Sequence, residues 1–278
     1  MKCFDNKVVV ITGAASGMGR AYALAFAKEN SQLALCDFDL QGLQETIKLV
    51  TASGCNNLTY KVFDISNEQE TFSFAEQVKS ELGNTHIIIN NAGIEGSAKP
   101  VWASDASFFK RVMEVNYFGV VNGTRAFLPQ LMENDRGVIV NVSSIFGLMG
   151  TPNHADYCAS KFAVRGFTEA LMVELSESNI QVHLLHPGGI NTNIARQEHS
   201  KTLSKHFLTT SPDDIANFMI KSIKKGKSRI VYGNQSIKAW LLSTLLPLKL
   251  INKLVWSEVK PVIDRSDYHF PKGSEQRK

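Results

Sequence analysis

The chain has 278 residues, which is enough to bury a full core as one large α/β domain, and its 44% hydrophobic and 20% charged residues are ordinary globular values. The net charge of +4 is modest, although half of the Lys and Arg residues lie after residue 200. We interpret this basic region as a solvated face, and the alternative is a contact for an anionic membrane or a nucleic acid; we expect no nucleic-acid partner.

The cysteines Cys3, Cys36, Cys55 and Cys158 are scattered and form no C-x-x-C pair. They are typical of reduced intracellular thiols, and they predict neither a disulfide framework nor a metal site. Because Met1 to Asn6 leads directly into the first predicted strand, we expect no signal peptide and a cytoplasmic location.

In chain order, short apolar runs alternate with longer helical stretches. The predicted strands are 8–12, 32–36, 58–63, 87–90, 138–142 and 181–185, and the predicted helices are 17–29, 40–51, 68–82, 106–133, 155–176 and 212–224. Strands that are apolar on both faces require helices on both sides. The sequence therefore predicts a single α/β domain over 1–278, with a doubly wound parallel sheet of Rossmann type and a C-terminal helical extension over 233–278.

A glycine segment joins the first strand to the first helix, with the spacing Gly13-x-x-x-Gly17-x-Gly19. Such a turn lets a pyrophosphate approach the backbone and the helix N-terminus, so this segment, with Ser16 and Met18, is a candidate dinucleotide site. The spacing differs from the commoner G-x-G-x-x-G pattern. The alternative is that the glycines only permit a turn.

Asp37 ends the second strand, where a carboxylate can accept hydrogen bonds from the adenosine ribose and repel a 2′-phosphate. This favours NAD over NADP. In the alternative, Asp37 or Asp39 only caps the next helix, and we assign that role to Asp39. Arg20 is a contrary signal, since a guanidinium near the pyrophosphate can also bind a 2′-phosphate.

Ser144 follows an apolar strand, and Tyr157 and Lys161 lie one helical turn apart. A free phenol has a pKa of about 10, and a neighbouring ammonium lowers it by stabilising the phenolate. The Ser144 hydroxyl can hold a substrate oxygen. Without further context, a Tyr and a Lys at this spacing can equally be surface residues.

These motifs together resemble the short-chain dehydrogenases/reductases over residues 5–195. The resemblance rests on Thr12-Gly-x-x-x-Gly17-x-Gly19, Asn90-Asn91-Ala92-Gly93, Asn116 in Glu114-Val115-Asn116-Tyr117, Ser143-Ser144, Tyr157-Cys158-Ala159-Ser160-Lys161 and His186-Pro187-Gly188. It implies that Tyr157 is the general acid/base, that Ser144 rather than Ser143 orients the substrate oxygen, and that Lys161 binds the nicotinamide ribose. Asn116 would support a proton-relay water.

The same resemblance implies further cofactor contacts. Asp64 would lie beside the adenine, and the alternative is that it only caps a loop. The other implied contacts are Ile65, Asn91, Gly93, Pro187, Gly188, Ile190 and Thr192. The implied reaction passes a hydride between NAD(H) and an alcohol or ketone, while Tyr157 gives or takes the proton. Members of this family are commonly oligomers, so a homodimer or homotetramer is expected.

The substrate pocket is expected between the segments 94–102, 146–154 and 193–210, the last of which is placed like a substrate lid. Phe146, Leu148 and Met149 indicate an apolar alcohol or ketone. His154, His199 and His206 are either polar contacts or plain loop residues. The apolar segment 237–250 is interpreted as a helix that covers the pocket or a partner subunit, and a membrane-surface helix is the alternative. A cofactor-binding or membrane-associated regulatory protein is the alternative function.

Overall fold

The computed structural model describes residues 1–194 and 197–269 of the chain. Its centre is a sheet of seven parallel strands in the order β3-β2-β1-β4-β5-β6-β7. The strands are β1 (Val8–Thr12), β2 (Gln32–Asp37), β3 (Leu58–Val62), β4 (Ile87–Asn90), β5 (Gly137–Val142), β6 (Ile180–Pro187) and β7 (Arg229–Tyr232). The chain runs outward from β1 to β3 and then returns to β4 beside β1, so the strand order reverses between β1 and β4.

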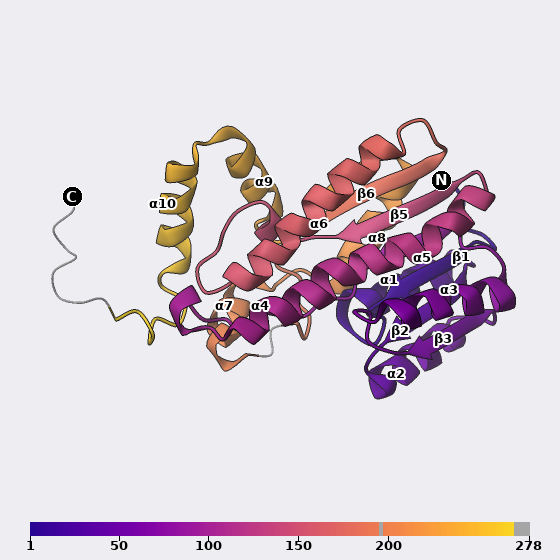
Figure 1. The fold of residues 1–278 in the computed structure, drawn as a ribbon, viewed down its shortest axis with the longest axis horizontal. Helices are drawn as coiled ribbons and strands as arrows, with labels where there is room; N and C mark the ends of the chain where they lie inside the picture. The colour runs from indigo at the N-terminus through magenta and orange to yellow at the C-terminus, as the bar shows by residue number, and fades with distance from the viewer. Residues whose placement is uncertain (195–196, 270–278) are drawn as a thin grey trace.

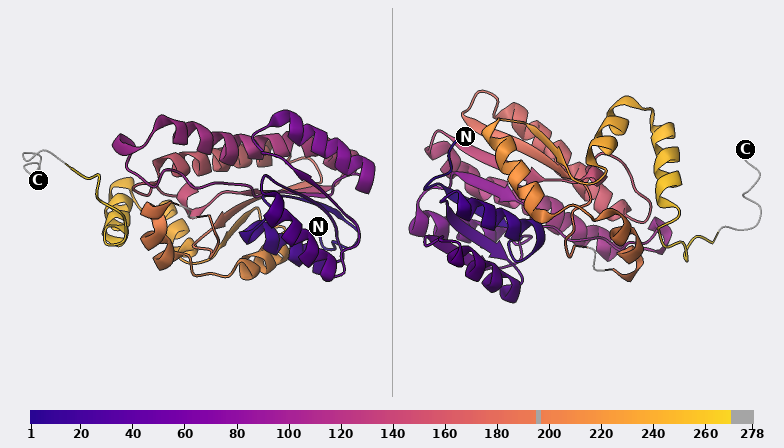
Figure 2. Two further views of the ribbon diagram at one scale, coloured as in Figure 1. Left: turned by 90° about the horizontal axis from the view of Figure 1, so that it is seen from below. Right: turned by 180° about the vertical axis from the view of Figure 1, so that it is seen from behind.

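Helices cover both faces of this sheet, as the sequence predicts (Figures 1 and 2). They are α1 (Gly17–Lys28), α2 (Leu40–Ala52), α3 (Glu68–Leu82), α4 (Ala106–Met113), α5 (Gly119–Glu133), α6 (Ala155–Glu174), α7 (Lys201–Phe207), α8 (Pro212–Lys224), α9 (Ser236–Leu245) and α10 (Leu248–Val259). Asp39 caps α2, since its carboxylate accepts a hydrogen bond from the Gly42 N–H at 3.1 Å.

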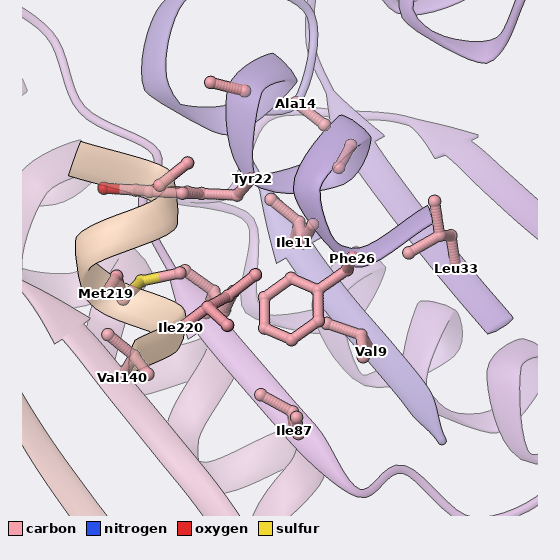
Figure 3. Packing of buried hydrophobic residues seen from close by; sticks show 14 of the residues in the cluster. Val9, Ile11, Ala14, Tyr22, Phe26, Leu33, Ile87, Val140, Met219 and Ile220 are labelled. Carbon is pink, nitrogen blue, oxygen red and sulfur yellow. The ribbon is translucent and has the colours of Figure 1, made fainter. Parts of the chain in front are cut away.

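The core has two halves, one on each face of the sheet, because alternate side chains of a strand point to opposite faces. Val9 and Ile11 pack with α1 and α8, and Figure 3 shows Phe26 and Met219 of these helices in the same cluster. Val8, Val10 and their neighbours pack instead against α3, α5 and α6. Burial on both faces explains why each strand reads as a continuous apolar run.

The structure corrects the sequence prediction at four places. The predicted helix over 106–133 is two helices, α4 and α5, separated by a π-helical turn at Glu114–Phe118. Strand β7 extends the sheet and helix α7 lies within the predicted lid, and neither was predicted as an element. The helix expected over 237–250 is also two helices, α9 and α10, because the chain turns at Pro247. The remaining boundaries agree to within two residues.

The C-terminal extension begins with the antiparallel pair α9 and α10, which meet at Leu246 and Pro247. Figure 1 shows this pair beside the ends of β5 and β6, apart from the helices that cover the sheet. Residues 270–278 of the predicted extension lie outside the described residues.

Candidate active site

The glycine loop packs so tightly that a side chain would not fit at two of its positions. Gly13 has φ +69°, and a Cβ there would lie 2.7 Å from the Cα of Ala92. A Cβ on Gly19 would lie 1.9 Å from the carbonyl oxygen of Gly13. The glycines therefore let α1 and the segment after β4 close on the loop, as the dinucleotide interpretation requires.

A groove of about 400 Å³ runs along this loop at the reversal of strand order. Of the predicted cofactor residues, it is lined by Gly13, Ser16, Gly17, Met18, Asp37, Asp64, Ile65, Asn91, Gly93 and Thr192. Gly17 lies directly against Thr192, since a Cβ on Gly17 would lie 3.1 Å from the Thr192 side chain. Residues from five separate segments of the sequence thus form one surface.

The groove has the features that a dinucleotide needs. The Ser16 side chain makes no capping hydrogen bond and the first turn of α1 holds no acidic residue, so the first amides of α1 remain available to a phosphate. The buried Oδ1 atom of Asn91 has no hydrogen-bond partner, although the Nδ2 of the same amide donates to Thr12 O at 2.9 Å. We conclude that the residues present fit a dinucleotide.

Asp37 lies at the end of this groove beside the loop. Its carboxylate accepts hydrogen bonds from the Ala15 N–H at 2.8 Å and from the Asp39 N–H at 3.0 Å. Burial raises the pKa of the Asp37 carboxyl, and these backbone hydrogen bonds oppose the shift. The Arg20 guanidinium is already engaged within the protein, since it donates to Ala15 O, Thr46 Oγ1 and Glu45 Oε2. The contrary signal from Arg20 is therefore weakened.

Asp64 and Ile65 form the wall of the groove that follows β3. Asp64 accepts hydrogen bonds from the Ser66 N–H at 3.0 Å and from the Arg111 guanidinium. Burial raises the pKa of the Asp64 carboxyl, but these hydrogen bonds together outweigh burial and hold that pKa below its ordinary value. Asp64 thus both closes a turn and lines the groove, so the two interpretations of this residue are compatible.

Asn116 lies in the π-helical turn between α4 and α5 and is fully buried. Its amide pairs with the backbone of Ile94 in both directions, accepting from the N–H at 2.8 Å and donating to the carbonyl at 3.0 Å. It also donates to the Ser160 hydroxyl on α6 at 3.1 Å. The turn therefore ties the segment after β4 to the helix that carries Tyr157 and Lys161.

Tyr157 and Lys161 lie on one face of α6, as their spacing predicts, with the Lys161 Nζ 5.5 Å from the centroid of the Tyr157 ring. That ammonium donates to the Val142 carbonyl at 3.1 Å. Burial lowers the pKa of Lys161 to about 8. Burial also raises the pKa of Tyr157, and a hydrogen bond with Ser144 opposes this shift. Burial therefore has a larger effect on the pKa of Tyr157 than the lowering that we expected from the Lys161 ammonium.

A second cavity, of about 200 Å³, opens beside the first and contains the candidate catalytic side chains Ser144, Tyr157 and Lys161. Phe146, Met149 and His154 line it, and the Phe146 ring meets the Tyr157 ring edge-on at 5.9 Å. The remaining walls come from α7, α9 and α10, through Leu203, Phe207, Ala239, Leu242, Ile251 and Val255 among others. The predicted pocket segment 146–154 and the C-terminal extension therefore meet at this cavity.

The segment after β6 joins the two cavities. Pro187, Gly188 and Ile190 line the second cavity, and Thr192 lines both. The predicted lid over 193–210 continues from here, although its residues 195 and 196 lie outside the described residues. His199 of this segment pairs with Asp264 at 2.5 Å, and the His206 ring meets the Phe207 ring edge-on. Neither histidine lines the cavity.

Sequence reasoning missed three charged residues at this site. Glu95 lines both cavities and accepts a hydrogen bond from the Gln197 N–H at 2.9 Å. Lys238 on α9 and Glu258 on α10 line the second cavity and form an ion pair at 3.0 Å. Glu95 lies two residues after the Asn90-Asn91-Ala92-Gly93 motif and could have been found from that position. The two members of the ion pair are 20 residues apart in the sequence, with no local signal.

Comparison with known proteins identifies the chain. A family model described as short chain dehydrogenase matches residues 7–203. The chain belongs to this family. Short-chain dehydrogenases are oxidoreductases with a nucleotide-binding Rossmann fold, so this assignment establishes the class of chemistry that the site performs.

The relatives agree with this assignment. The putative oxidoreductase SadH of Mycobacterium tuberculosis is 37% identical over 258 residues, which cover 88% of this chain and 93% of that protein. Estradiol 17-beta-dehydrogenase 11 of Macaca fascicularis is 32% identical over 257 residues, covering 90% of this chain and 82% of the relative. A short chain dehydrogenase/reductase from Burkholderia phymatum in complex with NAD superposes with a TM-score of 0.78 and is 30% identical, covering 83% of this chain and 90% of the other.

None of the helices within residues 1–194 and 197–269 has both the length and the apolar character needed to cross a bilayer.

Proposed function

We propose that this short-chain dehydrogenase transfers a hydride between NAD(H) and an apolar secondary alcohol or ketone. The observation that carries the proposal is that Ser144, Tyr157 and Lys161 line a cavity that adjoins the glycine-loop groove. The two spaces share six lining residues, which are Met18, Asn91, Gly93, Glu95, Thr192 and Ile194. Two ligands can therefore meet where the candidate catalytic residues lie.

Each catalytic residue has a role that follows from its contacts. Tyr157 gives or takes the proton of the substrate oxygen, and its hydrogen bond with Ser144 favours the phenolate. Ser144 orients the same oxygen. Lys161, held by Val142 O, provides a positive charge beside the phenol, and Asn116 supports a relay water next to Ile94. Bound NAD supplies the hydride acceptor at its nicotinamide carbon.

Two features support the preference for NAD over NADP. The Asp37 carboxylate lines the groove at the end of β2, where it disfavours a 2′-phosphate. The Arg20 guanidinium, which could otherwise bind such a phosphate, is held by the Ala15 carbonyl and by Glu45. The similarity to a solved structure in complex with NAD is consistent with this preference.

The apolar walls of the second cavity support an apolar substrate. Leu203, Phe207, Leu242 and Val255 are among its lining residues, and most of the surface that faces the cavity is apolar. The similarity to an estradiol dehydrogenase supports the same substrate class. We propose that segment 193–210, including α7, is the substrate lid, and that the protein works as a homodimer or homotetramer.

The test is NAD-linked turnover on a panel of secondary alcohols and ketones by the wild type and by Tyr157→Phe. Loss of the proton carrier should lower turnover by about 10²–10⁴-fold, while NADH binding, followed by fluorescence, stays unchanged. Tyr60→Phe, which changes an exposed tyrosine on β3, is the matched control. If Tyr157→Phe retains full turnover, the acid/base assignment is wrong. If NADH binds and no panel member reacts, the binding-only alternative gains support.

A further inference from the structure

Helices α9 and α10 form a hairpin, residues 236–259, that extends beyond the sheet on the side of the substrate cavity. Figures 1 and 2 show the two helices side by side, apart from the helices that cover the sheet. One side of the hairpin lines the cavity through Ala239, Leu242, Ile251 and Val255. The other side faces solvent.

The solvent side of the hairpin carries a row of large apolar side chains. Ile237, Leu241 and Leu245 repeat every four residues and so share one face of α9. Leu248, Leu250 and Leu254 continue the exposed set on α10. Leu245 and Leu248, which flank the turn between the helices, have exposed fractions of 73% and 71%. Single exposed leucines are common, but a concentrated set at a projecting turn indicates a contact surface.

The charge around this apolar row is positive. Within the hairpin, residues 236–259, three lysines, Lys238, Lys249 and Lys253, are accompanied by one acidic residue. Lys249 and Lys253 lie on α10 among the exposed leucines, and Lys260 follows the helix. The single acidic residue of the hairpin, Glu258, is paired with Lys238. An anionic partner therefore matches this surface.

We propose that the α9–α10 hairpin docks the protein on the surface of an anionic lipid bilayer, with the exposed leucines in the interface and the lysines against the headgroups. Exposed apolar side chains flanked by lysines are typical of helices that lie in the plane of a membrane surface. Helices of 10 and 12 residues extend only about 15–18 Å at about 1.5 Å per residue, so they suit the interface.

A second copy of this chain is a poorer occupant of the same surface. In a symmetric dimer both copies contribute the same patch, so Lys249 and Lys253 of each copy would bring four positive charges into one interface. The hairpin offers no unpaired acidic residue to balance them, because Glu258 already binds Lys238. A bilayer of anionic lipids has no such conflict.

The same arrangement gives apolar substrates a route to the active site. Leu254 is exposed on the hairpin and also lines the substrate cavity, so the lipid-facing side and the cavity meet at this residue. This part of the inference rests on the proposed function. It places the hairpin as the path by which a lipid-dissolved alcohol enters the cavity.

The experiment measures cosedimentation of the full-length protein with vesicles of phosphatidylcholine alone and of phosphatidylcholine with 30% phosphatidylserine. The test variant is Leu245→Glu, and the matched control is Val173→Glu on α6, since both wild-type side chains are 73% exposed. A second variant, Lys249→Gln with Lys253→Gln, tests the charge. Because these four side chains are exposed, the variants are expected to fold.

The proposal expects binding to the anionic vesicles that weakens with salt. Leu245→Glu should weaken this binding at least tenfold. The lysine variant should weaken binding several-fold, on anionic vesicles only, and Val173→Glu should leave binding unchanged. Absence of binding by the wild type, or equal binding by wild type and Leu245→Glu, overturns it. Sedimentation without lipid distinguishes the other occupant. If Leu245→Glu forms smaller assemblies than the wild type while its vesicle binding is unchanged, the surface binds a second copy of the chain instead.

Vesicle binding needs no turnover, so its result is independent of the proposed function. Conversely, Leu245→Glu should keep wild-type turnover on a short, water-soluble secondary alcohol, because Leu245 does not line the cavity. A loss of turnover on such a substrate, with vesicle binding intact, would contradict the proposed role of the hairpin.

Discussion

The carboxylate of Asp156 accepts a hydrogen bond from the backbone N–H of Ser97 at 2.7 Å, and this contact ties the segment after β4 to the first turn of α6. The same carboxylate accepts the N–H of Tyr157 at 2.7 Å. Gly96 leaves room for it, since a Cβ there would lie 2.2 Å from an Asp156 oxygen. Asp156 therefore fixes the backbone of the proposed proton carrier.

Asp156→Ala should remove both hydrogen bonds and leave two buried amides without an acceptor. We expect the free energy of unfolding to fall by about 1–3 kcal/mol, measured by urea denaturation. Turnover should fall as well, because the first turn of α6 carries Tyr157. Glu76→Gln, at an exposed residue of α3, should change stability by less than about 0.5 kcal/mol. Equal stability of Asp156→Ala and wild type would show that the contact carries no energy.

The pH dependence of stability should report the burial of Lys161. Its pKa in the folded state is about 8, below the ordinary value of 10.5, so the unfolded chain binds more protons between these values. Stability from this group is therefore lowest below pH 8 and rises as the pH increases toward 10.5. Relative to Lys161→Met, the wild type should gain up to about 1.4 kcal/mol per pH unit from pH 8 to 10. A constant difference across this range would contradict the lowered pKa.

Two glycines in helices should respond oppositely to alanine. Gly19→Ala places a methyl 1.9 Å from the Gly13 carbonyl oxygen, so the glycine loop must move. We expect a loss of about 1–3 kcal/mol in stability and at least tenfold weaker NADH binding. Gly166→Ala on α6 meets no atom within 4 Å and should stabilise the protein by about 0.5–1 kcal/mol. NADH titration and thermal unfolding of both variants test the pair.

Asp37→Ser should reduce the preference for NAD over NADP. The change removes the charge that disfavours a 2′-phosphate and one strong acceptor for the ribose, so we expect the ratio of kcat/KM values to fall by about 10–100-fold. Asp39→Asn keeps the α2 cap and should leave the ratio unchanged. An unchanged ratio in Asp37→Ser would assign the selectivity to another residue.

The sheet could be predicted because its strands are unusually clear in the sequence. Val8–Thr12 and Ile87–Asn90 are buried on both faces, so continuous apolar runs mark them with the observed boundaries. The candidate site follows from the same strands, because its residues stand just after their carboxyl ends. The motif residues Ser144, Tyr157 and Lys161 line one cavity; the spacing of Tyr157 and Lys161 predicts that these two share a helix face, and the family resemblance adds Ser144.

Other features depend on contacts that a local pattern does not contain. The π-helical turn around Asn116 lies within a sequence that is helical throughout, and its partner Ile94 is 22 residues away. Strand β7 has only four residues and follows a basic loop, so its apolar run is too short to predict. The raised pKa of Tyr157 arises from burial, which the spacing of Tyr157 and Lys161 does not reveal.

The glycine-loop groove and the substrate cavity share a wall, so the shape of the substrate cavity depends on what occupies the groove. Four of the residues in this wall line both the substrate cavity and the glycine-loop groove: Met18, Asn91, Gly93 and Thr192. A dinucleotide bound in the groove, as the proposed function requires, would cover these residues and form part of the floor of the second space. On that proposal the substrate site would be complete only in the loaded enzyme, so the cofactor would bind before the substrate and leave after the product.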